Sequence, residues 1–245
     1  MFRFRQPEEF AIVLLLLAFI PSNVHATSIN QDEARDDLAS GVLLGRLSTK
    51  HEKTWQAIRQ IIYSEDAFGR SLQPMLRGLF EQLQTSRHSI YLEFDDSRAG
   101  CRCTAGRFSI ERLDPEGIRH VAVIRLYLRI IDHAFAGTEA DLKDGLVPFA
   151  GLDKVDRYAE VLAHEMAHAV DILFNPERAW RVAEFSGKSH QVIQQRLLRT
   201  GRIEPGEERK LQERQVFLHE LEKPAVKAEV AVWRELIESR KKRKP

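Results

Sequence analysis

The chain has 245 residues, of which 43% are hydrophobic and 30% are charged, an ordinary composition for a soluble globular protein. Its formal net charge is +1, so no overall electrostatic argument favours nucleic acid or an acidic partner. The length favours one domain.

The N-terminal segment has the pattern of an export signal. Arg3 and Arg5 give it a positive start, residues 11–20 form an apolar run, and residues 24–26 offer a small-x-small cleavage site. A membrane-spanning helix needs about 20 apolar residues, so this run is short for an anchor. The pattern predicts a signal peptide over residues 1–26 and an exported protein, periplasmic or secreted, without stable membrane insertion after cleavage. An uncleaved anchor is the alternative.

The remainder, residues 27–245, is predicted to form one domain of the α+β class. Residues 27–87 are expected to be a helical N-terminal part, in which Pro74 marks the start or a kink of one helix. Residues 88–131 contain three runs that alternate or are rich in β-branched residues, and these predict a small antiparallel or mixed sheet. The runs are Ser89–Phe94, Arg107–Leu113 and Arg119–Ile131.

Two cysteines, Cys101 and Cys103, lie between the first two of these runs. In an oxidising compartment they could pair. With a single residue between them, the disulfide would require a sharp turn rather than an extended strand. Free thiols, or a bond to another chain, are the alternatives.

Residues 155–240 are predicted to be mainly helical. The first helix has a wide apolar face, and the later ones are more highly charged. Pro224 is expected to begin a new helix, because proline is tolerated in the first turn and not in the interior. The predicted helices are Val155–Asn175, Glu177–Arg199, Glu207–Lys223 and a last one from Pro224 to about Ser239.

The Val155–Asn175 helix contains the sequence H-E-x-x-H-x-x-D. Residues i and i+4 share a helix face, so His164 and His168 can bind one zinc ion. Glu165 sits about 100° round the helix, where it can take a proton from water on the metal. Both histidines and Asp171 fall on the polar side of the helix rather than in the core. The alternative is a solvated face that carries two histidines by chance.

A catalytic zinc site needs three protein ligands and one open position. Glu229 lies within an apolar stripe of the predicted last helix, where a buried carboxylate needs a cation, either zinc or a basic side chain. Glu229 is therefore the predicted third ligand, with Glu184 as its competitor and Glu222, just before Pro224, as a more distant one. Asp171 lies too far along the helix to join them, and is expected to fix an imidazole, hold a neighbouring loop or lie on the surface.

The motif resembles the gluzincin clan of zinc metallopeptidases, and within it the lethal-factor type. Those proteins place a third ligand glutamate on a later helix in an A-E-x-A-like context, which residues 228–231 match. The resemblance covers about the last third of the chain, and it implies a zincin-like fold and peptide hydrolysis. That type also carries a tyrosine near the ligand glutamate, thought to assist the oxyanion. This chain has no tyrosine after Tyr158, so His219 is expected in that role, with His190 and Arg234 as alternatives.

These observations predict an exported zinc-dependent metallopeptidase. Zinc held by His164, His168 and Glu229 would polarise water, and Glu165 would pass the proton of that water to the leaving amine. The family likeness makes a peptide or protein the expected substrate, and Arg119–Ile131 is expected to offer it a sheet edge. The alternative is a non-catalytic exported binding protein with a structural or relic zinc site.

Overall fold

The computed structural model describes most of the chain from residue 41 onward. The described residues are 41–44, 49–96, 105–114, 116–134, 152–186, 192–193, 195–196, 199, 204 and 206–243. The predicted signal peptide, both cysteines and His190 lie outside them. Within these residues, the structure contains no helix with the length and apolar character needed to cross a bilayer.

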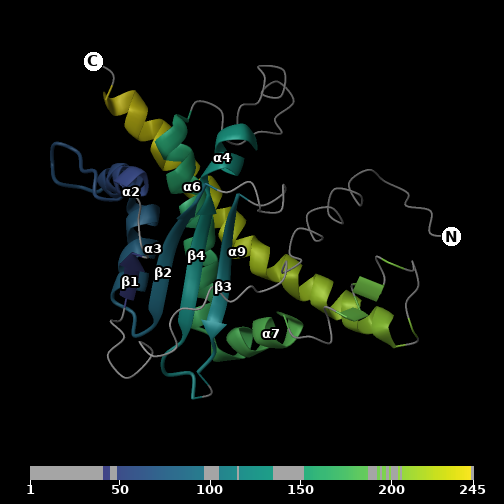
Figure 1. Ribbon diagram of the computed structural model, residues 1–245. Helices are drawn as coiled ribbons and strands as arrows, with labels where there is room; N and C mark the ends of the chain where they lie inside the picture. The colour runs from purple at the N-terminus through teal and green to yellow at the C-terminus, as the bar shows by residue number, and fades with distance from the viewer. Residues whose placement is uncertain are drawn as a thin grey trace.

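The described strands form one mixed sheet of four, in the order β1-β2-β4-β3. Three are parallel, and β3 runs antiparallel to β4 at one edge (Figure 1). This confirms the α+β class with a small mixed sheet, whereas the zincin-like arrangement stays a prediction. The strands are β1 (Gly41–Leu44), β2 (Ser89–Asp95), β3 (Gly106–Arg112) and β4 (Val121–Tyr127). β1 was not predicted, since its region was expected to be helical.

The expectation that the run Arg119–Ile131 forms an edge is wrong. β4 pairs with β2 on one side and with β3 on the other, and six of its seven residues are buried. A continuous apolar strand fits the middle of a sheet, where both faces are covered. β3 carries the more polar sequence GRFSIER and takes the edge. The chain then passes directly from β4 into α4 (Leu128–Ala134).

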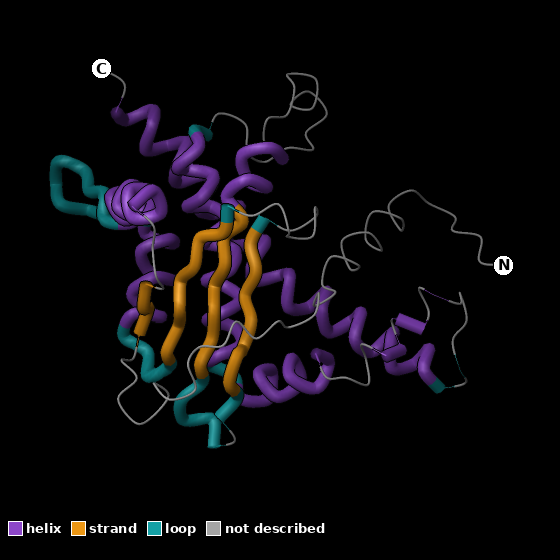
Figure 2. The backbone as a smooth tube through the Cα atoms, viewed as in Figure 1, coloured by secondary structure: helices purple, strands orange, loops and turns teal. Residues whose placement is uncertain are grey.

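Helices cover the sheet from behind in the view of Figures 1 and 2. The predicted zinc helix is α6 (Lys154–Leu173), whose N-cap Asp153 accepts hydrogen bonds from the backbone N–H groups of Val155 and Asp156. α3 (Pro74–Gln84) begins at its proline, so of the two predicted alternatives Pro74 marks the start of the helix and not a kink. The other helices are α2 (Thr49–Ile62), α7 (Pro176–Ser186) and α9 (Glu207–Arg243).

α9 is one continuous helix, and the predicted break at Pro224 is wrong. A proline in a helix interior costs about 3 kcal/mol because it removes a hydrogen bond and crowds the preceding turn. Here apolar residues on both sides of the proline are buried along one face, and this packing holds the helix together. They are Leu218, Leu221, Ala225, Ala228, Val232 and Leu236.

α6 packs between the sheet and α9. On the sheet side, Leu162 and Met166 are buried in one cluster with Ile124 and Leu126 of β4. Burying each such side chain contributes about 1.5–3 kcal/mol. On the other side, α9 covers the polar face of α6, so that Glu160 is fully buried. The prediction that both histidines and Asp171 lie outside the core is therefore wrong for His168, which is buried, while His164 and Asp171 are half-buried.

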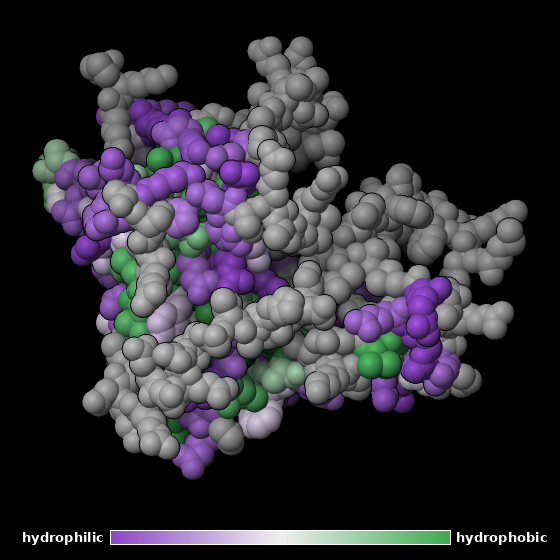
Figure 3. Space-filling model, viewed as in Figure 1, coloured by the Kyte–Doolittle hydropathy of each residue, from purple (hydrophilic) through white to green (hydrophobic). Residues whose placement is uncertain are grey.

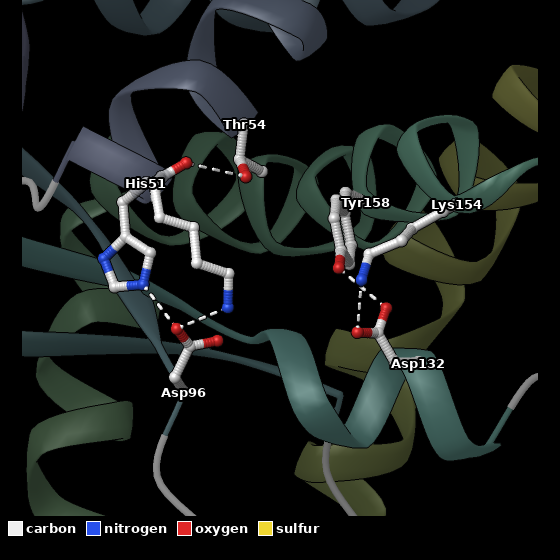
Figure 4. A network of polar contacts seen from close by, with 7 residues as sticks. His51, Thr54, Asp96, Asp132, Lys154 and Tyr158 are labelled. Atoms are coloured by element: carbon white, nitrogen blue, oxygen red, sulfur yellow. Dashed lines mark hydrogen bonds and ion pairs between the residues drawn. The ribbon is translucent and has the colours of Figure 1, made fainter.

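Polar contacts hold both α2 and α6 near the carboxyl ends of the parallel strands (Figure 4). Asp96, just after β2, accepts a hydrogen bond from Lys50 Nζ at 2.7 Å and lies 3.1 Å from His51 Nε2. Asp132 of α4 accepts bonds from Tyr158 Oη at 2.7 Å and from Lys154 Nζ at 2.5 Å. Burial and Asp132 raise the pKa of Tyr158 to about 12. The phenol stays neutral, and the second cluster fixes the first turn of α6.

The described surface in this view combines extended hydrophilic areas with smaller apolar patches (Figure 3). That distribution is normal, because isolated apolar groups are common on the surfaces of soluble domains.

Candidate metal centre

The helical spacing of the motif brings two imidazoles together. His164 and His168 lie one turn apart on α6, and their ring centroids are 4.8 Å apart. Their Nε2 atoms are 3.1 Å apart. His168 is 5% exposed, so the pair lies at the edge of the core rather than on an open helix face.

The carboxylate of Glu222 on α9 lies beside both of these nitrogens. Its Oε2 lies 3.4 Å from His164 Nε2, and its Oε1 lies 3.5 Å from His168 Nε2. Four ligands held tetrahedrally at about 2.05 Å from zinc are about 3.3 Å from one another. The distance between the two nitrogens and the distance from each nitrogen to its nearer Glu222 oxygen are close to that spacing, and one ligand atom from each residue lies within 4.8 Å of the others. Among the described residues, these three form the one group of histidine, cysteine and acidic side chains with metal-binding geometry.

Glu229, the predicted third ligand, contacts the opposite side of His164. Its Oε2 lies 2.8 Å from His164 Nδ1. A carboxylate in this position accepts the Nδ1 proton, which leaves the Nε2 lone pair free to bind a metal. The structure therefore places Glu229 against Nδ1 of His164 and places Glu222 beside the Nε2 atoms of both histidines.

The charges of this group call for a cation. Burial disfavours a charged His164, yet the carboxylates of Glu222 and Glu229 raise its pKa to about 10. Burial also acts against a charged Glu222, but hydrogen bonds with the two histidines lower its pKa to about 2. Without a metal, a proton on His164 supplies the positive charge. A divalent ion that binds here must displace it, so metal affinity falls as the pH falls.

Glu165 points to the sheet side of the same turn, toward the edge strand β3. It is 6% exposed, and burial raises its pKa while the nearby histidines and the Phe108 backbone N–H oppose the shift. A Cβ on Gly106 would lie 2.7 Å from both the Cγ and the Oε1 of Glu165. β3 can approach the helix this closely because position 106 has no side chain. A carboxylate of raised basicity beside the two imidazoles suits a proton acceptor.

The other predicted residues lie outside this group. Asp171 pairs with Arg178 and so ties α6 to α7, the expected option of holding a neighbouring segment. Glu184 is exposed on α7. His219 is exposed on α9 one turn before Glu222, and both line the same cavity. Arg234 lies twelve residues beyond Glu222, about 18 Å along the helix, too far to assist an oxyanion at the metal group.

One buried group near the site was missed by the sequence analysis. Glu160 lies one turn before His164 and is 0% exposed, and neither of its carboxyl oxygens has a hydrogen-bond partner among the residues that the structure describes. Burial first, then the negative charges of Glu229 and Asp156, raise its pKa to about 9. Its place on the helix face followed from the sequence, but its burial depends on α9. It is a neutral acid near pH 7.

Comparisons of the chain with protein-family models, with curated proteins and with solved structures find no match. The class of site is therefore defined by geometry alone. It contains the imidazoles of His164 and His168, the carboxylate of Glu222 beside both, the carboxylate of Glu229 on the far side of His164, and the buried Glu165 beside the edge strand β3.

Proposed function

We propose that this protein is an exported zinc-dependent metallopeptidase in which His164, His168 and Glu222 hold the metal. The observation that carries the proposal is the cluster of two imidazole nitrogens 3.1 Å apart with a Glu222 oxygen 3.4 Å from one and the other Glu222 oxygen 3.5 Å from the second, next to the buried Glu165. The leader pattern in residues 1–26 supports export. Two imidazoles and one carboxylate form a ligand set of known catalytic zinc sites, which leaves a fourth position open.

Each residue has a defined part in the proposed reaction. Zinc, when bound, supplies a Lewis acid that lowers the pKa of water toward about 7. Glu165 accepts the proton of the attacking water and then delivers it to the departing amine. Glu229 holds His164 in the required tautomer. His219 stays our proposal for the further oxyanion donor, because it lines the cavity that contains Glu222.

The sheet supports a peptide as the substrate. β3 is an edge strand, and its first residues lie against Glu165. An extended peptide can add to such an edge through main-chain hydrogen bonds, which would bring a peptide carbonyl near the proposed base. This role was expected for residues 119–131, and β3 takes it in the proposal.

The ligand assignment is tested by metal analysis and zinc titration of E222Q and E229Q, with E184Q as the control. We expect E229Q to lower zinc affinity about 10- to 100-fold, the usual effect of losing an orienting partner. E222Q should lower zinc affinity further, because it removes a proposed ligand, and E184Q should bind zinc with the affinity of the wild type. If E229Q loses more than E222Q, Glu229 is the ligand and the assignment is reversed.

The catalytic assignment is tested by E165Q. We expect this variant to keep its zinc and lose peptide hydrolysis, measured with a quenched-fluorescent peptide mixture and a chelator control. Removing a general base costs about 100- to 10,000-fold in rate. Hydrolysis at the wild-type rate would exclude Glu165 as the base.

One observation favours a second function, a structural zinc clamp in a non-catalytic binding protein. Glu222 belongs to α9 and the two histidines to α6, so a bound ion would link the two helices. In that case zinc would raise the melting temperature of wild type and E165Q equally, and neither would hydrolyse peptides. Less than about half a zinc per chain after repletion would count against both functions.

A further inference from the structure

The charges on α9 are segregated beside the candidate metal centre. Between residues 222 and 235 the helix carries three acids and three cations. All three acids face inward: Glu222 toward both histidines, Glu229 toward His164, and Glu235 toward the backbone N–H of Met75. The net charge of the whole chain conceals this local separation.

The three cations lie on the opposite side of the helix. Lys223 and Arg234 are exposed, as is Lys227, and none forms an ion pair with a carboxylate in the part of the chain that the structure describes. Elsewhere on α9, Arg209 pairs with Glu213, and Arg240 pairs with Asp153 and Asp156. The exposed acids Glu220 and Glu238 border this stretch at its two ends, and between them residues 223–234 expose cations and no acid.

The cations border an apolar surface that begins at the metal group. A cavity of about 560 Å³ is lined by Glu222, by His219, by the three cations and by an aliphatic stripe of Val226, Val230 and Ala231. Val226 is 47% exposed. From Lys223 to Arg234 the helix rises about 16 Å, the length of about five residues of an extended peptide. A chain that lies along the cavity reaches Glu222 at one end.

We propose that this surface, the α9 groove, binds the substrate on one side of the scissile bond and selects peptides that combine acidic with aliphatic side chains. The inference rests on the proposed metallopeptidase function for its orientation, whereas the described residues that line the groove all belong to α9. Aliphatic side chains would cover Val226 and Val230, and carboxylates would pair with Lys223, Lys227 and Arg234. Such pairs are exposed, so added salt should weaken them.

The test measures binding to the full chain, loaded with zinc, by fluorescence anisotropy. The probe is a short labelled peptide of leucine and glutamate, and its matched forms carry glutamine or lysine in place of glutamate. We expect the acidic probe to bind about tenfold more tightly than the glutamine form at low salt, the effect of three exposed ion pairs. Equal binding of the two forms would overturn the proposal.

Two triple variants locate the effect. K223E/K227E/R234E should lose the preference for the acidic probe and gain one for the lysine probe. K210E/K241E/K242E changes the net charge equally, at exposed positions of the same helix outside the groove, and should keep the wild-type preference. If both triple variants lose the preference for the acidic probe equally, the preference comes from the net charge of the protein and the proposal is overturned. K223Q/K227Q/R234Q, checked by circular dichroism, provides a milder version if charge reversal prevents folding.

Two further outcomes separate the candidate occupants and the two proposals. If anionic phospholipid vesicles bind with the same dependence on the groove and displace the peptide, the occupant is a membrane and the peptide proposal fails. If the acidic preference holds but the wild-type protein hydrolyses no peptide, the groove stands and the peptidase proposal fails. If the wild-type protein hydrolyses peptides but shows no preference for the acidic probe, the peptidase proposal stands and the groove proposal fails.

Discussion

Two glutamates on α9, Glu222 and Glu229, contact the imidazole of His164 from opposite sides. The sequence analysis favoured Glu229 as the zinc ligand and considered Glu222 a more distant candidate. Glu222 and Glu229 are seven residues apart, two turns on one helix face, so either could be directed at α6. Glu229 was predicted as a zinc ligand because a buried acid needs a cation, and in the structure it contacts Nδ1 of His164. It could not say which ring nitrogen of His164 that acid would meet. Glu222 ranked low because Pro224 was expected to start a new helix after it.

Glu160 is the buried group whose energetics are clearest. An acid whose folded pKa is raised keeps a proton that the unfolded chain has released, so its cost to stability grows as the pH rises from 4.5 toward about 9. At pH 7, about 2.5 units above the ordinary pKa, keeping Glu160 protonated lowers the free energy of unfolding by about 3 kcal/mol.

We therefore expect E160Q to be more stable than the wild type, and the gain to be larger at pH 8 than at pH 5, because glutamine is neutral at both. Urea unfolding of the chelated protein at the two pH values measures this. E184Q, at an exposed position, is the control and should show no pH-dependent gain. An equal gain at both pH values would show that Glu160 is not held neutral by burial.

At the scale of elements, α9 organises the site. One continuous helix presents Glu222 and Glu229 to α6, and farther on it presents Glu235 to α3. The N-cap residue of α3, Gln73, makes no side-chain capping bond. Glu235 replaces that cap: its two oxygens accept from Met75 N at 2.9 and 3.2 Å. A negative charge at a helix N-terminus is favourable, so this contact ties α3 to α9.

Removing this cap should destabilise the fold without affecting the metal. We expect E235A to lower the free energy of unfolding by about 1 kcal/mol, the usual value of an N-cap. Zinc stoichiometry should be unchanged. E238A, an exposed glutamate on the same helix, is the control and should be neutral within error. Loss of zinc in E235A would mean that this contact also positions the metal-binding acids.

At the scale of the whole molecule, a buried pair of histidines links the sheet to the C-terminal end of α6, where His88 contacts the ring of Phe174. His88 and His120 stack with ring centroids 5.0 Å apart, and both are almost fully buried. Each Nδ1 accepts a backbone N–H bond at 3.1 Å, His88 from His120 and His120 from Asp114. Both rings must stay unprotonated at Nδ1, so acid breaks these bonds.

This pair predicts that acid weakens the fold. Burial lowers the pKa of His88 to about 4, and the positive charges of His120 and Arg87 act in the same direction. A hydrogen bond with the Leu173 backbone and the charge of Asp114 oppose this shift. Between pH 6.5 and about 4 the unfolded chain binds more protons, so stability is lost as the pH falls through this range. The full loss from His88 is about 3 kcal/mol.

The acid-induced loss of stability from His88 is tested by urea unfolding of the chelated protein between pH 7 and pH 4. H88Q should start less stable but lose less as the pH falls, whereas H219Q, at an exposed position, should follow the wild type. Parallel curves for H88Q and the wild type would rule out His88 as the acid-sensitive group.

The sequence by itself determined the local features. Helical spacing placed both histidines and Glu165 on one turn of α6, and the alternating runs predicted a small sheet within an α+β fold. These follow from contacts within a few residues. The signal peptide and the zincin-like fold stay predictions.

The tertiary structure decided what depends on residues far apart in the chain. It placed β3 rather than β4 at the edge, kept α9 continuous through Pro224, buried Glu160, and brought Glu222 to the two imidazoles. Local propensity cannot determine these features, because packing of α9 against α6 outweighs the cost of an interior proline. That same packing selects which acid meets which nitrogen.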